Sequence, residues 1–439
     1  MAENENFDIE DGSRSLPAFF RRLVEEDVDT ERRRFIIKVP PYISRFNSDA
    51  YMPRVVSIGP YHHGKEHLRS MEARKRRCVS SFMKRSGCNP QRCYDRFREL
   101  TPQLMQYYEH LDTEWRNEDK FLELMVVDGC FLLEYFSSRT LPDGDPAKDI
   151  FLGSVGSSIK RDLLLIENQL PIQVIRQLYS LGDQCRVIKD IENIILDFFR
   201  GGQITTTLSC LHVLDVYRKG VLRQIGSPLP HKVRCFPGPP FPSAMDLSRT
   251  GIKFKVIGTY GLVDIHFDNE RGFLSLPCIV VDEDTATLFL NLMALEKLDI
   301  MERNGVSSYV AFMGLLIRSA QDVKVLRSRR IIVSEESDDV IARLFNELGK
   351  NPVNDPDNCL YVVRSALARW SNSYIRKCNE RLVDWGTKFL QTYCKNPWTA
   401  IGLVAGAILL VATVTQAVYA VLQYYQDDLS LAPPNAFGP

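Results

Sequence analysis

Apolar residues are spread unevenly along this chain, and their distribution divides it into a polar arm, a globular region and one membrane helix. Residues 1–34 are polar and charged, so we expect an N-terminal arm that cannot build a core. Residues 35–349 keep a high apolar density, which predicts a mostly helical globular domain. Residues 350–397 predict a polar loop followed by an amphipathic juxtamembrane helix. Residues 398–423 predict a transmembrane helix, and residues 424–439 remain as a short tail.

The globular region has mostly the residue spacing of helices. Asp119–Phe136 is apolar on nearly every face, which predicts a buried helix. Asp162–Tyr179 has the same character, although Pro171 interrupts it. Further helices are expected at residues 71–84, 187–199, 208–225, 286–301, 308–320 and 338–348.

The strongest strand signal follows a proline-rich break at residues 227–242. Ile252–Ile257, Leu262–Phe267 and Phe273–Val281 are rich in β-branched and aromatic residues, and glycines or a turn separate them. We therefore predict a small antiparallel β element near residues 252–282. The expected fold class is mainly α with this β element (α+β), together with one C-terminal transmembrane helix.

Thr399–Leu422 contains no charged residue and is long enough to cross a bilayer. At about 1.5 Å per residue it spans about 36 Å, against about 30 Å for the hydrocarbon core. Because basic residues precede this helix and none follows it, we expect residues 1–395 to face the cytosol, at the plasma membrane or in the endomembrane system. The flanking charges are Arg376, Lys377, Arg381, Lys388 and Lys395 before the helix, and Asp427 and Asp428 after it.

The predicted membrane helix carries a stripe of residues suited to helix–helix association. Gly402 and Gly406 form a Gly-x-x-x-Gly pair, which lets two helices approach closely. With about 100° per residue, Thr413 and Gln416 fall within about 40° of Gly402. A glutamine amide that faces lipid stays unpaired, so we expect a homo- or hetero-oligomer through this face. The alternative is that glycine is simply frequent in membrane helices.

Composition and charge argue against several classes of function. The chain has 55 basic and 55 acidic residues, which gives no support for nucleic-acid binding, and residues 74–77 fit a solvated helix face. Eleven cysteines without a clustered framework indicate reduced thiols in the cytosol. We expect neither a metal nor a cofactor, because the candidate ligands lack companions at a suitable spacing: Cys88 and Cys93, and the histidines His62, His63 and His67.

The sequence contains no Gly-x-Gly-x-x-Gly, Walker loop, His-Glu-x-x-His or Gly-x-Ser-x-Gly pattern. Carboxylates do lie inside apolar segments, at Asp128, Asp162 and Glu167, where they could serve general acid–base chemistry. The interpretation we favour is a structural polar network. In it these carboxylates, with Asn168 and Gln169, satisfy backbone groups and tie the two segments together.

Four motifs follow one another along the chain. Residues 51–64 read YMPRVVSIGPYHHG, residues 128–134 DGCFLLE and residues 162–171 DLLLIENQLP, and NPW begins at residue 396. The loop of the first motif contains Ser57, Gly59, Pro60, Tyr61, His62, His63 and Gly64. Together the motifs resemble the plant family named domain of unknown function 247, from about residue 35 to residue 424. The resemblance implies a C-terminally anchored plant protein without established enzyme activity, some of whose relatives in grasses are associated with self-incompatibility.

We therefore expect a membrane-anchored, non-enzymatic binding, recognition or signalling module of plants, with a protein partner that the sequence does not identify. One alternative is an enzyme with an unrecognised acidic site at Asp128, Asp162 and Glu167. A third is a multimeric pore lined by Thr413 and Gln416, although one uncharged helix offers little to select ions.

Overall fold

The structure, a computed structural model, describes residues 35–45, 47–138, 151, 154–182, 191–200, 210–222, 241–258, 261–299, 304–350, 360–373 and 397–430. The chain forms two compact units, Met1–Ala368 and Arg369–Pro439. The predicted N-terminal arm, most of the predicted juxtamembrane segment and the end of the predicted tail lie outside the described residues. Within the juxtamembrane segment, residues 361–373 are helical.

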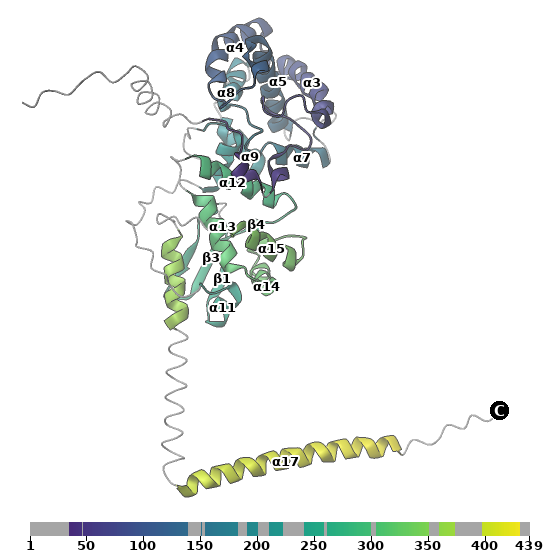
Figure 1. The fold of residues 1–439 in the computed structure, drawn as a ribbon, viewed down its shortest axis with the longest axis vertical. Coiled ribbons are helices and arrows are strands. Elements are labelled where there is room, and N and C mark those ends of the chain that lie inside the picture. Colours follow the sequence, from purple (N-terminus) through teal and green to yellow (C-terminus); the bar gives the residue numbers. More distant parts are fainter. Residues whose placement is uncertain are drawn as a thin grey trace, which may run out of the picture. The chain divides into compact units, whose positions relative to one another are not determined.

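The helices of the first half of the larger unit gather around α5 (Glu118–Ser137), as Figure 1 shows. Side chains on nearly all sides of α5 are buried, among them Phe121, Met125 and Phe131, which confirms the predicted buried helix. Its neighbours include α3 (Arg69–Ser86), α4 (Pro90–Met105), α8 (Ile172–Leu181) and α9 (Ile191–Arg200). The other elements of this half are α2 (Pro41–Ser44), η1 (Ser48–Tyr51), η2 (Glu66–Leu68), η3 (Thr113–Arg116), α7 (Ser154–Asp162) and α10 (Val213–Leu222).

The second half of this unit packs short strands with further helices. α12 (Thr285–Leu298) connects the halves, because it contacts η1 and α10 on one hand and α13 and α15 on the other. The helices here are α11 (Ala244–Arg249), α13 (Gly305–Leu316), α14 (Ala320–Ser328) and α15 (Asp338–Leu348). The strands are β1 (Lys253–Ile257), β2 (His266–Asp268), β3 (Phe273–Pro277), β4 (Ile279–Val280) and β5 (Ile332–Val333).

The mainly α fold class is confirmed, but the β element is mixed rather than purely antiparallel. β2 and β3 form the predicted antiparallel hairpin, whose turn is fixed by the Asp268 carboxylate accepting hydrogen bonds from the next amides and by Gly272 at φ +68°. β1 occupies the other side of β3 and runs parallel to it, in the order β1-β3-β2. β4 pairs in parallel with β5, which the sequence pattern did not predict.

The predicted helix Asp162–Tyr179, with its interruption at Pro171, is only partly confirmed: the part after Pro171 is helical and the part before it is not. α7 ends at Asp162, α8 begins after Pro171, and residues 163–171 between them are irregular. The break places the polar run Glu167–Gln169 in a loop instead of on a helix. This loop contributes Glu167, Asn168 and Gln169 to the site described below.

The smaller unit contains α17 (Pro397–Ser430), which continues past the predicted end of the membrane helix. Its segment Ala405–Leu422 is long and apolar enough to cross a membrane, and none of it is buried within the chain. It is the one helix with these properties in the part of the chain that the structure describes.

Candidate functional site

Residues 52–64, here called the motif loop, run through the interior of the helical half without regular secondary structure. Residues 56–60 are buried. A buried backbone that pairs with no strand needs other partners for its N–H and C=O groups. Side chains from α3, from α5 and from residues 161–168 supply them.

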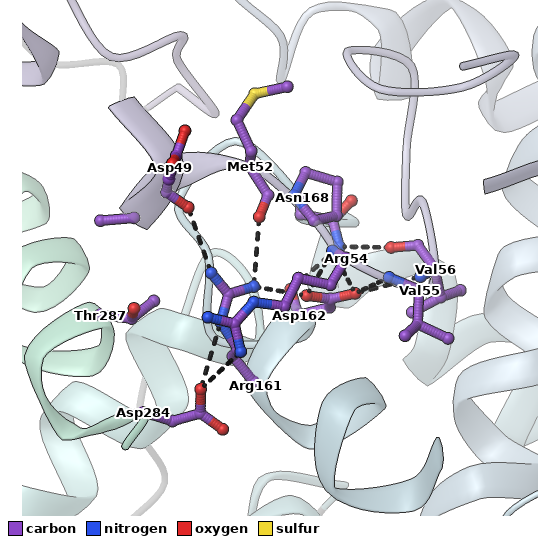
Figure 2. A network of polar contacts seen from close by, with 12 residues as sticks. Asp49, Met52, Arg54, Val55, Val56, Arg161, Asp162, Asn168, Asp284 and Thr287 are labelled. Carbon is purple, nitrogen blue, oxygen red and sulfur yellow. Dashed lines mark hydrogen bonds and ion pairs between the residues drawn. The ribbon is translucent and has the colours of Figure 1, made fainter. Parts of the chain in front are cut away.

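The Asp162 carboxylate holds the start of the motif loop (Figure 2). It accepts hydrogen bonds from three successive backbone amides: Arg54 at 3.0 Å, Val55 at 2.7 Å and Val56 at 3.1 Å. The Asp162 side chain is fully buried. Three convergent amides form a concave anion site, here filled by the protein's own carboxylate.

Arg161 fixes the segment just before these amides. Its guanidinium donates to the carbonyl oxygens of Asp49 and Met52, each at 3.2 Å, and to Asp162 Oδ1 at 2.8 Å. Only 2% of its side chain is exposed. The buried charge pair is therefore surrounded by further hydrogen bonds, the condition under which burial of two charges is tolerated.

Asp284, directly before α12, extends this cluster to the second half of the unit (Figure 2). Its Oδ1 lies 3.4 Å from Arg161 Nε and accepts from Arg54 Nη1 at 3.3 Å. Burial raises the pKa of Asp284 above its usual range, against the opposing effect of the two guanidinium groups. Residues from three distant parts of the sequence thus meet at one point.

A second buried ion pair holds the middle of the motif loop. Lys75 Nζ lies 2.6 Å from Asp128 Oδ1 and donates to the Ser57 carbonyl at 2.9 Å. Asp128 Oδ2 accepts from the Gly59 amide at 2.8 Å. Both charged side chains are fully buried, and burial raises the pKa of Asp128 in spite of Lys75. Glu72, whose side chain is 24% exposed, also places its Oε1 2.8 Å from Lys75 Nζ.

Asn168 fastens the loop between these two ion pairs. Its Oδ1 accepts from the Ile58 amide at 2.7 Å. Its amide nitrogen donates to the carbonyls of Val56 at 3.0 Å and Asp162 at 2.9 Å. Three of its hydrogen-bonding positions are thus used, and the residue is fully buried.

Gln169 stabilises the irregular loop to which Asn168 belongs. Its amide nitrogen donates to the carbonyls of Leu163 and Leu165, both at 2.7 Å, and its oxygen accepts from the Leu214 amide at 3.0 Å. These bonds replace the helical ladder that the sequence pattern predicts for residues 162–170. Gln169 also connects this loop to α10.

Glu167, from the loop at residues 163–171, lies beside the end of the motif loop at His62. It accepts from the Val39 amide at 2.7 Å, and its other oxygen lies 3.2 Å from His62 Nε2. Lys65 Nζ lies 2.8 Å from His62 Nδ1. Since an ammonium has only hydrogens to donate, Nδ1 acts as the acceptor there and the ring proton is on Nε2. Nε2 makes no hydrogen bond among the described residues, although it lies close to Glu167.

The remaining residues of the first motif pack at the edge of this network. The Tyr61 hydroxyl lies 2.7 Å from the Ile36 carbonyl oxygen and 2.5 Å from the Glu109 carbonyl oxygen, and its one hydrogen serves one of these acceptors at a time. Burial raises the pKa of Tyr61 above its usual range. His63 makes an edge-on contact with the Trp115 ring. Gly64 adopts φ +82° with open space around it. No group of three or more potential metal ligands occurs among the described residues.

Of the five predicted network residues, Asp128, Asp162, Glu167 and Asn168 contact the motif loop, whereas Gln169 stabilises the neighbouring loop at residues 163–171. Asp128 and Asn168 join through the backbone of Ile58 and Gly59, so the two segments are tied indirectly. Lys75 was not predicted as a member of the network; it occupies a core position in the apolar row of α3 with Met71, Cys78 and Phe82. Arg161, Asp284 and Asn291 were not predicted either; Asn291 accepts from the Ile166 amide and donates to the Ala50 carbonyl.

The acidic residues proposed as an alternative catalytic site are used structurally. Asp128 and Asp162 are fully buried, and each accepts hydrogen bonds from backbone amides of the motif loop. Glu167 accepts from another backbone amide. A general acid or base must reach the proton that it transfers, and these oxygens face the protein's own backbone. The arrangement fixes a loop; it offers no exposed pair of carboxylates to a substrate.

The predicted association stripe lies on the exposed surface of α17. Cβ atoms built at Gly402 and Gly406 meet nothing within 4 Å in the chain. The Thr413 hydroxyl donates to the Leu409 carbonyl of its own helix at 2.7 Å. Its oxygen therefore stays available only as an acceptor, and Gln416 provides the donor groups of the stripe.

Comparisons with known proteins confirm the family resemblance. The model of the family DUF247, described as plant protein of unknown function, matches residues 36–412. The UPF0481 protein At3g47200 of Arabidopsis thaliana is 27% identical over 440 residues, covering 91% of this chain and 89% of the relative. The putative UPF0481 protein At3g02645 of the same plant is 22% identical, covering 85% and 88%. No solved structure matches the chain.

Proposed function

Since the chain belongs to DUF247, the plant protein family of unknown function, we propose that it is a membrane-anchored binding module without catalytic activity. α17 anchors the protein, the larger unit binds a protein partner in the cytosol, and the glycine stripe brings two membrane helices together. Recognition or signalling at the membrane surface is the role of such a module.

The observation that carries this proposal is the exposed apolar surface of α17. Every side chain described in Ala405–Leu422 is exposed within the chain, and the two glycines face open space. In water this surface is unfavourable, whereas in a bilayer it is solvated by lipid. Close approach of a second helix at Gly402 and Gly406 also gives the Gln416 amide a partner.

The motif loop supports a binding role over an enzymatic one. The carboxylates around it accept hydrogen bonds from its backbone amides. The buried ion pair of Lys75 and Asp128 holds this irregular segment in one conformation. Such a network gives the larger unit a rigid surface, and rigidity lowers the entropic cost of binding a partner.

The test is crosslinking of the full-length protein in native membranes. Gly402→Leu combined with Gly406→Leu fills the stripe, and we expect the crosslinked dimer to be lost while the protein stays in the membrane. The matched control is Val411→Leu with Val418→Leu, which enlarges side chains on the side of the helix roughly opposite the stripe. Unchanged crosslinking of the glycine variant contradicts association through the stripe. Release of the protein by alkaline carbonate contradicts the anchor, and ion flux across liposomes supports the pore instead.

A further inference from the structure

The two sides of α3 differ strongly in character. Met71, Lys75, Cys78 and Phe82 point inward and are buried. Lys75 and Glu72, the one acidic residue of the helix, are engaged with each other and with the motif loop. Glu72 therefore does not neutralise the basic residues on the outward side of α3.

The outward side carries four exposed cations, here called the α3 basic face: Arg69, Arg74, Arg77 and Lys84. At 3.6 residues per turn they lie within an arc of about 140° and extend about 22 Å along the axis. The other positions in this arc are Ser70, Ala73, Ser80 and Ser81. The face thus contains cations and small side chains, without an acid or a large apolar group.

The four cations of this face make no ion pair within the part of the chain that the structure describes. Arg76, at the margin, behaves differently, because it pairs with Glu123 of α5 at 3.0 Å. Arg327 of α14 likewise pairs with Asp338 at 2.9 Å. The chain as a whole carries 55 basic and 55 acidic residues, so four unpaired cations on one helix face are a local concentration of charge.

We propose that the α3 basic face docks onto anionic lipid headgroups of the membrane in which α17 is inserted. The inference rests on the proposed membrane anchor. Basic residues precede α17 in the sequence, from Arg376 to Lys395, so the flank of the anchor and the α3 basic face suit the same anionic leaflet. The small residues between the cations let guanidinium groups reach phosphates without steric hindrance.

The shape of the face favours a membrane over a protein or nucleic-acid ligand. It is one convex helix surface without a large apolar side chain in its arc, so a peptide finds little apolar surface to bury there. Tethering by α17 also keeps the membrane at a high effective concentration, so weak headgroup contacts suffice to orient the larger unit.

The test uses full-length protein reconstituted into phosphatidylcholine vesicles with or without phosphatidylserine. Arginine- and lysine-directed labelling, read by mass spectrometry, reports the exposure of Arg69, Arg77 and Lys84. A cation at an anionic surface gains about 1 kcal/mol, so we expect labelling to slow about fivefold in anionic vesicles at low salt, and the effect to vanish in high salt. Lys324 and Arg329, which are exposed on and just after α14, serve as internal controls.

A variant removes the face while leaving one reporter. In the triple variant Arg69→Gln/Arg77→Gln/Lys84→Gln we expect Arg74 to lose its lipid-dependent protection from labelling. In the control variant Lys324→Gln/Arg329→Gln we expect Arg74 to keep this protection. Equal labelling of inserted protein on both lipids overturns the docking but leaves the anchor intact. Protection by RNA or an acidic peptide in place of vesicles also overturns it. Protein that fails to insert overturns the anchor instead.

Discussion

Replacement of Asp162 by asparagine tests whether this carboxylate holds the motif loop. Oδ2 accepts from the amides of Arg54, Val55 and Val56, and Oδ1 accepts from Arg54 and from the Arg161 guanidinium. An asparagine keeps one acceptor oxygen and replaces the other with an NH2 group. Either orientation of the amide therefore turns a donor toward buried donors.

The expected cost follows from burial. Hydrogen bonds to a charged group contribute about 1.5–3 kcal/mol each, and removing one partner of a buried ion pair costs about 3–5 kcal/mol. Because these contributions share one carboxylate, we expect Asp162→Asn to lower the free energy of unfolding by about 3–5 kcal/mol. This is a large part of the about 5–15 kcal/mol that is typical of a folded domain.

The assay is urea unfolding of the full-length protein in detergent micelles, combined with limited trypsin digestion. Arg54 is exposed, so a released motif loop becomes cleavable there. Asp112→Asn is the matched control, because Asp112 is 62% exposed and pairs with Lys38 at 3.5 Å; its cost stays below about 1 kcal/mol. An Asp162→Asn protein within about 1 kcal/mol of the wild type, and resistant at Arg54, refutes the reasoning. If that folded protein also loses a catalytic turnover, the enzyme alternative gains support.

Three further predictions concern the same unit. Gly59→Ala places a Cβ 2.5 Å from a backbone oxygen at a residue with φ +73°. We expect it to lower the urea midpoint more than Gly64→Ala, because Gly64 has φ +82° but nothing within 4 Å of its Cβ position. Equal midpoints of the two variants contradict this. Lys75→Met leaves Asp128 unpaired, so we expect the free energy of unfolding to fall by about 3–5 kcal/mol at neutral pH. Part of this stability returns in acid, where Asp128 is protonated. A loss that does not depend on pH contradicts this. Burial raises the pKa of Glu296 above its usual 4.5, so the folded protein holds this proton more tightly than the unfolded chain. The contribution of Glu296 to stability therefore falls as pH rises above 4.5, and Glu296→Gln removes this contribution from the pH dependence of unfolding; identical pH dependence of the two proteins contradicts it.

Much of the helical architecture follows from apolar spacing alone. The predicted helix at residues 119–136 corresponds to α5 (Glu118–Ser137), and that at residues 338–348 to α15, which Ser337 caps. α4 was not predicted, because its buried residues form a narrow row within a strongly polar sequence. α14 was missed because its apolar row is short and directly follows the end of α13.

The candidate site shows where local pattern fails. The run at residues 162–170 is apolar enough for a helix, but side chains of Asn168 and Gln169 satisfy its backbone, so an irregular loop is stable. Parallel pairing of β1 with β3 also depends on contacts between distant segments, which spacing does not encode. The residues of the network were predicted, because polar groups inside apolar segments need partners; the partners Lys75 and Arg161 required the fold.

Protease protection in sealed native vesicles tests the membrane-anchored arrangement most directly. Full-length protein carries a tag at each end, and protease is added to cytosol-out vesicles before and after detergent. If α17 crosses the membrane and the larger unit faces the cytosol, only the C-terminal tag is protected until detergent is added, and this is the result we expect. Protection of the N-terminal tag, or loss of both tags without detergent, contradicts it.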